Sequence, residues 1–440
     1  MAERCVIVAP YWGHPNHVGV YRVERFVRWL GAAGVAVTVV RAGAADFATS
    51  RPWGMDVTIR DPFNFYPEAA PGPSATPAAS PAASPAASVA PPPPRRPNRL
   101  RRFVAYSLFN PDPTVVWACR AAAHPLVREH TAGARWVLAS SPPESAHVGA
   151  ERLARRLGAE LLVDMRDGWL DDPLKPTLRA SRLQRWREGR TERRVLRAAS
   201  RVFVTSSVWR RMLLERRPEL ADRVTVLTNA YPSRMPQLEA PRPGALTLLH
   251  AGQFSLSRGT QRVGTLLAPL AASSRFAASA PGRVVLLGKL GEADLTEAGE
   301  WRRRLGEVGW TLETPGEVPR DEALARLGSA HGLLLLCAAE AAIPSKAFEY
   351  LCVRRPVLAV TGAAGALWEA CRDVPQVFLT DPAAPDPSRV DAFLQAAAGG
   401  MSDGTYERPE RFGEAALGRT FLDALGLGEA PVRQPAAAEG

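Results

Sequence analysis

Residues 136–165 read WVLASSPPESAHVGAERLARRLGAELLVDM and contain the pattern that recurs along the chain. Two short apolar runs, 136–141 and 160–165, flank an amphipathic stretch whose apolar positions follow a helical period. A strand, a helix and a second strand in this order predict a parallel βαβ unit. The stretch therefore predicts an α/β fold.

The same alternation continues through most of the chain. The predicted strands lie at 4–10, 35–40, 136–141, 160–165, 201–206 and 224–229 in the first half, and at 245–252, 283–288, 332–337, 356–360 and 376–380 in the second. A chain of 440 residues exceeds the size of most single hydrophobic cores, so we expect two parallel-sheet domains. The proline-rich segment 231–244 lacks apolar periodicity and is predicted to be the interdomain linker.

The expected domain limits follow from this linker and from two irregular segments. We predict an N-terminal domain at 1–235 with a disordered insertion at about 67–98, a C-terminal domain at 245–405, a terminal helix at 406–427 and a disordered tail at 428–440. The insertion contains ATPAASPAASPAASVAPPPP, which offers too little apolar surface to offset chain entropy. It is either a plain solvated linker or a spacer that carries nearby arginines to an anionic membrane. These arginines are Arg95, Arg96, Arg99, Arg101 and Arg102.

The net charge of +11 is distributed unevenly. Residues 1–240 contain 35 Lys and Arg against 21 Asp and Glu, an excess of 14, whereas residues 241–440 contain 20 against 23, a deficit of three. The basic surface therefore belongs to the first half. A membrane surface, a phosphorylated substrate and nucleic acid are the candidate anionic partners.

The cysteines and the apolar runs indicate the compartment. The five cysteines are far apart and none forms a Cys-x-x-Cys pair, which disfavours a disulfide framework or a zinc site. The sequence has no run of eighteen apolar residues, and its first ten residues do not resemble a signal peptide. We expect a cytoplasmic protein, with peripheral attachment to the inner face of the membrane as a further hypothesis.

Several motifs occur in an order that resembles group 1 (family 4) glycosyltransferases. Residues 140–169 are similar to their Ser-x-Pro-Pro, His and Asp-x-Arg-Asp-x-Trp signature, and PYWGHPNHVGVYRVERFVRWLGAAG is similar to their first loop and helix. FNPDPTVVW and VTVLTNAYP resemble two further elements, with Ala230 in place of the usual glycine. HAGQFSLSRG and IPSKAFEYLCVRRPVLAV look like the donor-site elements. The resemblance covers about 5–425 outside the insertion.

The resemblance implies a GT-B fold, in which two Rossmann-like parallel-sheet domains face each other across a cleft and the last helix crosses back to the first domain. It also implies transfer from a nucleotide-diphosphate sugar with retention, no metal ion and no cofactor besides this co-substrate. The implied acceptor is a glycan, a lipid-linked molecule or a small molecule. Transfer of this kind needs no protein nucleophile, because the leaving phosphate can take the proton of the acceptor.

The segment IPSKAFEYL supplies candidate donor ligands. Ser345 is predicted to be the N-cap of a helix whose N-terminus, together with Lys346, binds phosphate. Glu349 matches the second glutamate of the family's Glu-x7-Glu motif, which implies hydrogen bonds to the ribose; alternatively it only complements the helix dipole. The first glutamate of the motif falls on Ala341, and Glu340, one position away, is a weaker candidate for a sugar contact.

In HAGQFSLSRG the family has an arginine and a lysine that clamp the diphosphate. Gln253 and Arg258 take these places here. A guanidinium can bind phosphate through two hydrogen bonds, whereas Gln253 donates hydrogen bonds but brings no charge. The donor clamp is therefore expected to depend on Arg258 and Lys346.

The loop after the first strand is the candidate acceptor or phosphate loop. Gly13 and Gly19 permit close backbone approach, and the helix expected near Val20 points its N-terminus at the bound ligand. His14 and His17 are either ligands of acceptor or phosphate, or loop residues without a chemical task. The loop lacks Gly-x-Gly-x-x-Gly, which disfavours an NAD enzyme.

Asp164, Arg166 and Asp167 end a predicted strand at the same edge. They form either a salt-bridge network that satisfies itself or an acceptor site, in which Asp167 is the candidate to accept a proton or orient the nucleophile. His147 is a second catalytic candidate and lies in the predicted helix that opens after SSPPES, before this strand. Its position is compatible with a core side chain and with a cleft side chain equally.

Residues 178–199 form a strongly basic predicted helix. Its arginines Arg179, Arg182, Arg190, Arg193 and Arg197 have spacings compatible with one face, and Leu183, Trp186 and Leu196 occupy others. The face is either ordinary solvated surface or a second signal for attachment to anionic lipid.

Two other functions remain alternatives. A nucleotide-sugar epimerase has a similar fold but catalyses a different reaction. A non-catalytic, basic nucleic-acid-binding protein fits the charge, although the sequence contains no recognised nucleic-acid motif, so we expect no nucleic-acid partner.

Overall fold

The computed structural model describes residues 3–14, 17, 19–66, 108–172, 175, 182–232, 235, 238, 240–254, 262–399, 406 and 408–428. The predicted insertion with its five arginines, Arg179, Arg258 and all but the first residue of the predicted tail lie outside these residues. The chain divides after Val202 into two compact units. We call residues 1–202 the N-terminal unit and residues 203–429 the C-terminal unit.

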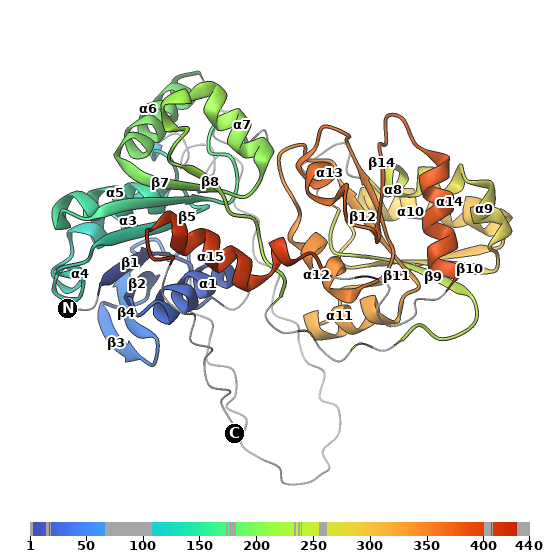
Figure 1. The fold of residues 1–440 in the computed structure, drawn as a ribbon, viewed down its shortest axis with the longest axis horizontal. Coiled ribbons are helices and arrows are strands. Elements are labelled where there is room, and N and C mark those ends of the chain that lie inside the picture. Colours follow the sequence, from blue (N-terminus) through green and yellow to red (C-terminus); the bar gives the residue numbers. More distant parts are fainter. Residues whose placement is uncertain are drawn as a thin grey trace, which may run out of the picture. The chain divides into compact units, whose positions relative to one another are not determined.

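An eight-stranded sheet forms the scaffold of the first half (Figure 1). Its strands are β1 (Arg4–Val8), β2 (Ala36–Gly43), β3 (Phe47–Arg51), β4 (Gly54–Arg60), β5 (Trp136–Ser141), β6 (Glu160–Met165), β7 (Ala199–Val204) and β8 (Val224–Val226). Their order is β3-β4-β2-β1-β5-β6-β7-β8. The pairs β4·β2, β2·β1, β1·β5 and β5·β6 are parallel, and β3 pairs with β4 in the antiparallel sense. The division between the two units falls within β7.

The helices that follow these strands bury one apolar face. They are α1 (Gly19–Ala32), α3 (Val115–Ala123), α4 (Pro125–Thr131), α5 (Ser145–Leu157), α6 (Arg182–Ala198) and α7 (Ser207–Arg216), with a 3-10 turn η2 at Pro218–Leu220. In α1 the buried apolar residues Val23, Phe26, Val27 and Leu30 recur every three or four positions, the period of one helix face. The start of α1 at Gly19 confirms the helix expected near Val20.

The C-terminal unit contains a six-stranded parallel sheet. Its strands are β9 (Leu246–Ala251), β10 (Gly282–Leu287), β11 (Trp310–Gly316), β12 (Gly332–Cys337), β13 (Val357–Thr361) and β14 (Val377–Thr380), in the order β11-β10-β9-β12-β13-β14. Its helices are α8 (Val263–Ala271), α9 (Ser274–Ala278), α10 (Glu292–Glu307), α11 (Arg320–Ser329), α12 (Ser345–Val353), α13 (Ala366–Cys371) and α14 (Pro387–Ala398). If the strands are numbered in chain order, this is the 3-2-1-4-5-6 order of a Rossmann sheet.

Two apolar cores cover the two faces of this second sheet. Leu334 and Leu336 of β12 point into a core shared with α8, α9, α10 and α14. Leu333 and Leu335 point into the opposite core with α11, α12 and α13. Because successive side chains of a strand alternate between faces, burial on both sides requires the continuous apolar run GLLLLC that the sequence contains.

The eleven predicted strands are confirmed, and three further strands are additions. β3, β4 and β11 were not expected from the sequence, and β11 shows why, because its residues alternate between buried and exposed or partly exposed positions. One face of such a strand is solvated, so its apolar signal is weaker than that of a central strand. Gly54, the first residue of β4, is required by packing, since a Cβ there would lie 2.0 Å from the Val37 carbonyl oxygen.

The end of the chain is helical, as predicted. A 3-10 turn η3 (Glu410–Phe412) precedes α15 (Glu414–Ala424), and Phe421 of α15 packs against Phe203 of β7 with ring centroids 5.3 Å apart. In the predicted linker, the Tyr231 amide donates to the Phe412 carbonyl over 3.1 Å. None of the described helices is both long and apolar enough to span a membrane.

In each sheet the strand order reverses at one point, because the connections on the two sides of that point run toward opposite edges of the sheet. In the first sheet it lies between β1 and β5, and in the second between β9 and β12. Ligands of open α/β sheets bind beyond the carboxyl ends of the strands at such points. The two points therefore define where the candidate sites are to be sought.

Candidate functional site

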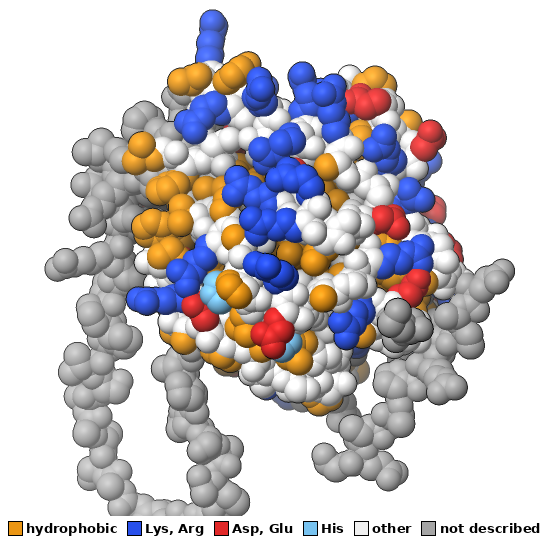
Figure 2. All heavy atoms as spheres, turned by 90° about the vertical axis from the view of Figure 1, so that its left-hand side faces the viewer, with side chains coloured by type: hydrophobic (Ala, Val, Ile, Leu, Met, Phe, Trp, Pro, Cys, Tyr) orange, Lys and Arg blue, Asp and Glu red, His pale blue; other side chains and the backbone are white. Residues whose placement is uncertain are grey.

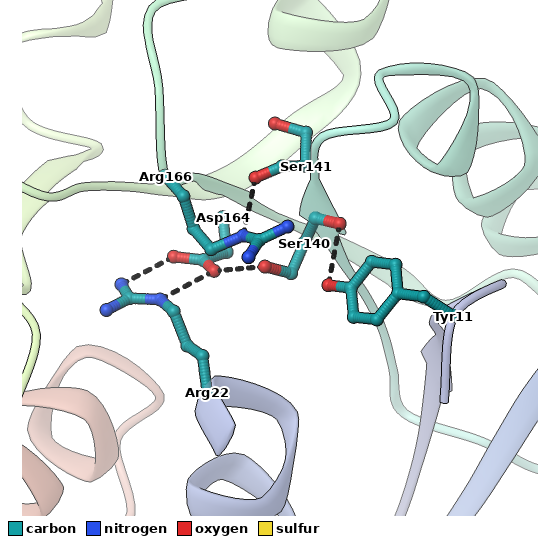
Figure 3. A network of polar contacts seen from close by, with 6 residues as sticks. All are labelled: Tyr11, Arg22, Ser140, Ser141, Asp164 and Arg166. Atoms are coloured by element: carbon teal, nitrogen blue, oxygen red, sulfur yellow. Dashed lines mark hydrogen bonds and ion pairs between the residues drawn. The ribbon is translucent and has the colours of Figure 1, made fainter. Parts of the chain in front are cut away.

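A buried ion pair joins the strand ends of the N-terminal unit (Figure 3). The Arg22 guanidinium donates to both carboxylate oxygens of Asp164, over 2.8 and 2.7 Å. The Ser140 hydroxyl donates to the same carboxylate over 2.6 Å, and the Tyr11 hydroxyl donates to the Ser140 carbonyl over 3.2 Å. Arg22 and Asp164 are almost completely buried, so we assign them a structural role: they tie α1 to the ends of β5 and β6.

Arg166 lies beside this network and faces the N-terminus of α1. Its guanidinium donates to the carbonyls of Ser141 and Pro142, each over 2.8 Å, and its Cζ lies 5.2 Å from the centre of the Tyr11 ring. A Cβ on Gly19 would lie 2.5 Å from the Arg166 guanidinium. Gly19 is therefore needed for Arg166 to approach the helix end, where the partly positive amides and the guanidinium together favour an anion.

The predicted loop histidines differ in their surroundings. His17 stacks on Tyr11 at 4.1 Å, and its Nδ1 accepts from the Gly19 amide over 3.2 Å, so it caps α1. Burial, together with the nearby Arg166 and His14, lowers the pKa of His17 to about 4, which keeps the ring neutral and able to accept. The Nδ1 of His14 is buried without a hydrogen-bond partner among the described residues. Gly13 has a φ of 79°, a conformation that favours glycine.

A pocket of about 420 Å³ opens next to the loop, and Asp167 lines it. Its other lining side chains include Tyr66, Asp112, Glu144, Asp172 and Lys175. Burial and the nearby Glu144 raise the pKa of Asp112 to about 6, although its carboxylate accepts from the amide and the hydroxyl of Ser145. Lys175 lies 3.1 Å from Glu144 and 3.3 Å from Glu188. We call this site the acidic pocket.

His147 is buried completely in α5. Its ring stacks on Trp169 at 5.7 Å, and burial lowers its pKa to about 4. The sequence left a core and a cleft position open, and the structure places His147 in the core. We therefore do not retain it as a catalytic candidate, because a side chain without exposed surface does not touch a substrate.

In the C-terminal unit, Lys346 and His250 meet at the point between β9 and β12. The Nδ1 of His250 lies 2.8 Å from the Leu334 carbonyl, so Nδ1 carries the proton and Nε2 accepts from the Lys346 ammonium over 3.2 Å. Burial and the lysine lower the pKa of His250 well below its usual value. Burial also lowers the pKa of Lys346 to about 8. The lysine therefore loses its charge readily when no anion is near.

Two glycine turns leave space around this lysine. Gly252 and Gly288 follow β9 and β10 with φ of 103° and 130°. A Cβ on Gly252 would lie 3.2 Å from the Lys346 ammonium, and one on Gly288 would lie 3.1 Å from the Gly252 backbone. The hydroxyl of Tyr350 accepts from the Ala251 amide over 2.7 Å and ties α12 to the end of β9. An anion at this position would meet a cation and the N-terminus of α12.

The first turn of α12 differs in one respect from the prediction. Pro344 is the N-cap, and Ser345 is the first helical residue with an exposed side chain, so the predicted N-cap role of Ser345 is corrected. Proline is suited to this position because its φ is restricted to a value compatible with a helix start. Glu349 lies one turn further and pairs with Arg320 over 2.6 Å. Burial raises the pKa of Glu349, against the effect of Arg320.

The remaining predicted donor residues lie in exposed loops or outside the described residues. Glu340 is exposed, and its carbonyl accepts from the Ala366 amide over 2.6 Å. Gln253 is exposed directly after Gly252. The structure thus brings Lys346, His250 and the two glycine turns together.

The N-terminal half matches a known family. Residues 19–230 match the glycosyl transferase 4-like domain. The matched residues include Arg166, the residues that line the acidic pocket, and strands β5 and β6. By its fold the chain is of the GT-B type.

Solved structures with a similar fold share little sequence identity with this chain. Anabaena HepE in complex with UDP has a TM-score of 0.52 and 13% identity, covering 96% of this chain and 99% of HepE. The E. coli trehalose-6-phosphate protein bound with UDP-2-fluoro glucose has a TM-score of 0.57 and 13% identity, covering 97% and 99%. A UDP-forming alpha,alpha-trehalose-phosphate synthase from Burkholderia vietnamiensis has a TM-score of 0.54 and 11% identity, covering 98% and 95%. No curated protein matches the chain by sequence.

Several residues at these sites were not singled out from the sequence. His250 ends β9 and Asp112 follows the segment FNP, and both are polar residues at the ends of apolar or proline-bounded segments. That position is the signal that could have identified them. Glu144 and Lys175 carried no such signal, because their roles arise from a contact between positions 31 residues apart. Among the described residues, no group of three or more His, Cys, Asp and Glu side chains is arranged to hold a metal ion.

The buried ion pair generates a stability prediction. Asp164→Asn removes the anion and leaves the Arg22 charge buried, which is expected to lower the free energy of unfolding by about 3–5 kcal/mol. Urea unfolding of the full chain measures the loss. Glu160→Gln is the matched control, since Glu160 pairs with Arg135 over 3.7 Å at the surface of the same sheet, and a loss below about 1 kcal/mol is expected. Equal losses in the two variants would contradict the structural role of the pair.

Proposed function

We propose that this glycosyltransferase moves a sugar from a UDP-sugar to a hydroxyl-bearing acceptor. The UDP and UDP-2-fluoro glucose bound in the similar structures support uridine as the nucleotide. A UDP-sugar carries two phosphates, a ribose and a hexose, so it requires an anion site beside a diol site. The end of β9 and the first turn of α12 offer both.

The observation that carries the proposal is the position of Lys346. Its ammonium lies at the point between β9 and β12, held by a neutral His250 and bordered by Gly252. The diphosphate is proposed to bind there, at the N-terminus of α12, because cations and backbone amides stabilise the charge that develops as it leaves. Arg258 and Gln253 are proposed to complete the phosphate contacts, and Ser345 lies exposed at the same helix end.

Glu349 is proposed to bind the ribose, with Glu340 as a further sugar contact. Its carboxylate is partly exposed one helical turn after Lys346, which matches the spacing between a phosphate and a ribose on one ligand. Two carboxylate oxygens suit a vicinal diol. Arg320 already pairs with this carboxylate, so it opposes the effect of burial on the Glu349 charge.

The N-terminal unit is proposed to bind the acceptor. The acidic pocket combines aromatic side chains with carboxylates, among them Asp167, and these groups accept hydrogen bonds from sugar hydroxyls. Its negative charge favours an uncharged end of a glycan, lipid-linked or small-molecule acceptor over a phosphorylated one. Arg166 with the loop of Gly13, His14, His17 and Gly19 is proposed to contact the acceptor or a phosphate.

We further propose retention without a metal ion or a cofactor. The bond between the anomeric carbon and the phosphate oxygen breaks, the acceptor oxygen bonds to the same face of that carbon, and the acceptor proton passes to the leaving phosphate. The charged Lys346 stabilises the phosphate during this step. We also propose a cytoplasmic location with peripheral attachment to an anionic membrane, and no nucleic-acid partner.

The ribose assignment predicts the effect of Glu349→Gln. The variant is expected to bind a UDP-sugar about 10- to 100-fold more weakly, because a charged hydrogen-bond acceptor is lost, and to lose transfer activity. Calorimetry with UDP-glucose and with its 2′-deoxyribose analogue measures both effects. Wild type is expected to bind the analogue more weakly than UDP-glucose. The variant is expected to bind the analogue as tightly as it binds UDP-glucose.

Glu322→Gln is the control for this experiment. Glu322 pairs with Arg326 on the exposed face of α11, and its loss is expected to leave donor affinity unchanged. Unchanged donor affinity in Glu349→Gln would exclude the ribose role.

The lowered pKa of Lys346 predicts a pH dependence of donor binding. The diphosphate binds the charged ammonium, and the free protein loses this charge as the pH rises through about 8. Affinity for a UDP-sugar is therefore expected to be constant below pH 8 and to fall by up to about tenfold per pH unit above it. Lys346→Arg should remove the decline, because a guanidinium stays charged. A decline of the same size in Lys346→Arg would assign it to another group.

The metal-free proposal predicts full activity in excess EDTA. The sequence has no Asp-x-Asp motif between two strands, and the lysine takes the place of a bound cation. Transfer from a UDP-sugar is measured with EDTA and with added manganese or magnesium. A strict requirement for either ion would contradict the proposal.

A further inference from the structure

The outward face of α6 carries only positive charge. The two acidic residues of the helix, Glu188 and Glu192, are fully buried. Its exposed charged residues are Arg182, Arg185, Arg190, Arg193, Arg194 and Arg197. Most basic helices intersperse acidic side chains at the surface, where each sign offsets the other. Here the acids of the helix point inward, and although Arg194 lies 3.7 Å from Glu151, the outer face presents an excess of positive charge.

A groove of about 620 Å³ runs along this face. Its lining includes Arg187, Arg190, Arg193 and Arg197, with Asn110 at one side. Guanidinium groups that line one hollow bind phosphate oxygens through paired hydrogen bonds. Figure 2 shows a face of the molecule on which basic side chains gather and acidic ones are few. The groove thus fits phosphate groups of an anionic partner.

Large apolar side chains lie among these arginines. On α6 itself, Leu183 is 65% and Trp186 is 61% exposed, and the Arg190 guanidinium lies 5.9 Å from the Trp186 ring. Tryptophan with arginine is the combination that occupies the boundary between lipid headgroups and acyl chains. A soluble phosphate would require the arginines alone and would leave both apolar side chains in water.

The apolar surface continues from α6 into a neighbouring segment. The Asn110 side chain donates to the Thr191 hydroxyl over 2.7 Å, which fixes residues 108–110 against the helix. In this segment Leu108 is 66% exposed, and the Phe109 ring lies 5.9 Å from the Phe63 ring. Phe63 and the adjacent Phe65 are 50% and 44% exposed. Two chain segments therefore add exposed apolar side chains beside the basic face.

We propose that this surface docks on an anionic lipid bilayer. We name it the α6 surface: the exposed arginines of α6 together with Leu183, Trp186, Leu108, Phe63 and Phe65. The arginines bind lipid phosphates, and the apolar side chains enter the interface beneath them. The inference rests on the peripheral membrane association proposed above and names the surface that provides it. It does not depend on the sugar or on the transfer reaction.

The test is flotation of the full chain with vesicles of equal parts phosphatidylcholine and phosphatidylglycerol. Wild type is expected to float with these vesicles at low salt, to be released as salt rises, and to ignore pure phosphatidylcholine. Each arginine near an anionic surface strengthens partition about fivefold, so Arg190→Gln, Arg193→Gln and Arg197→Gln together should weaken it by about 100-fold. Replacement of the same three residues by lysine should retain most of the binding.

The matched control changes three exposed arginines of the C-terminal unit, Arg303, Arg372 and Arg389, to glutamine. It alters the net charge equally and is expected to float like wild type.

Leu183→Ser with Trp186→Ser keeps every charge and should also weaken binding, which a purely electrostatic surface would not show. Wild-type flotation of the Arg→Gln variant, or equal loss in the control, would overturn the proposal.

Two further readouts separate this inference from the proposed function. Donor affinity is expected to be unchanged in all of these variants, because the Lys346 site belongs to the other unit. Failure of wild type to float while UDP-sugar binding persists would reject the α6 surface alone. Dextran sulfate tests the alternative of a soluble polyanion. If the protein binds it as tightly as it binds vesicles, and if this binding is unchanged in Leu183→Ser with Trp186→Ser, the face would be assigned to a soluble polyanion instead.

Discussion

A parallel strand that is buried on both faces can present polar groups only where it ends, and this constraint places the candidate sites of the protein. β12 is buried along its whole length, and so is β5. Polar side chains consequently gather in the last positions of the strands, at Ser140 and Asp164 in one sheet and at His250 in the other. The reversal of strand order then leaves a place for ligand at each of these edges.

The buried charges at these two sheet edges differ in how they are paired. At the first edge, Arg22 and Asp164 neutralise each other through two hydrogen bonds, and their charges are not available to a ligand. At the second edge, the Lys346 ammonium contacts a neutral histidine, and burial disfavours its charge. The first arrangement stabilises the fold, whereas the second becomes more favourable when an anion binds. The difference explains why we treat one as structural and the other as a donor site.

The distribution of charge is less simple than the net value implies. The first half has an excess of 14 positive charges, yet it contains a pocket lined by Asp112, Glu144, Asp167 and Asp172. The arginines lie outward on α6 while the acids of that helix turn inward. One unit can therefore combine an acidic pocket for a hydroxyl-bearing acceptor with a basic face for an anionic surface. A count of charges along the sequence gives only their sum and does not separate the acidic pocket from the basic face.

Sequence patterns alone predicted the α/β class and eleven strands, most of them central, because burial on both faces demands apolar runs that are visible without a structure. The motif resemblance added the GT-B fold and the donor and loop residues. The edge strands β3 and β11 were missed, because many of their residues are exposed, which weakens the apolar pattern. The internal strand β4 was missed because its buried Asp56 and Thr58 interrupt the apolar run.

Tertiary structure decided which polar residues meet. It buried His147 against Trp169, joined Lys346 to His250 across 96 positions, and turned the acidic side of α6 inward. It also moved the cap of α12 from Ser345 to Pro344. Local sequence limits which side chains lie on one strand or helix face, but burial and pairing depend on elements that are distant along the chain. For that reason the elements of this protein could be predicted from its sequence, and the contacts that distinguish a structural charge from a binding charge could not.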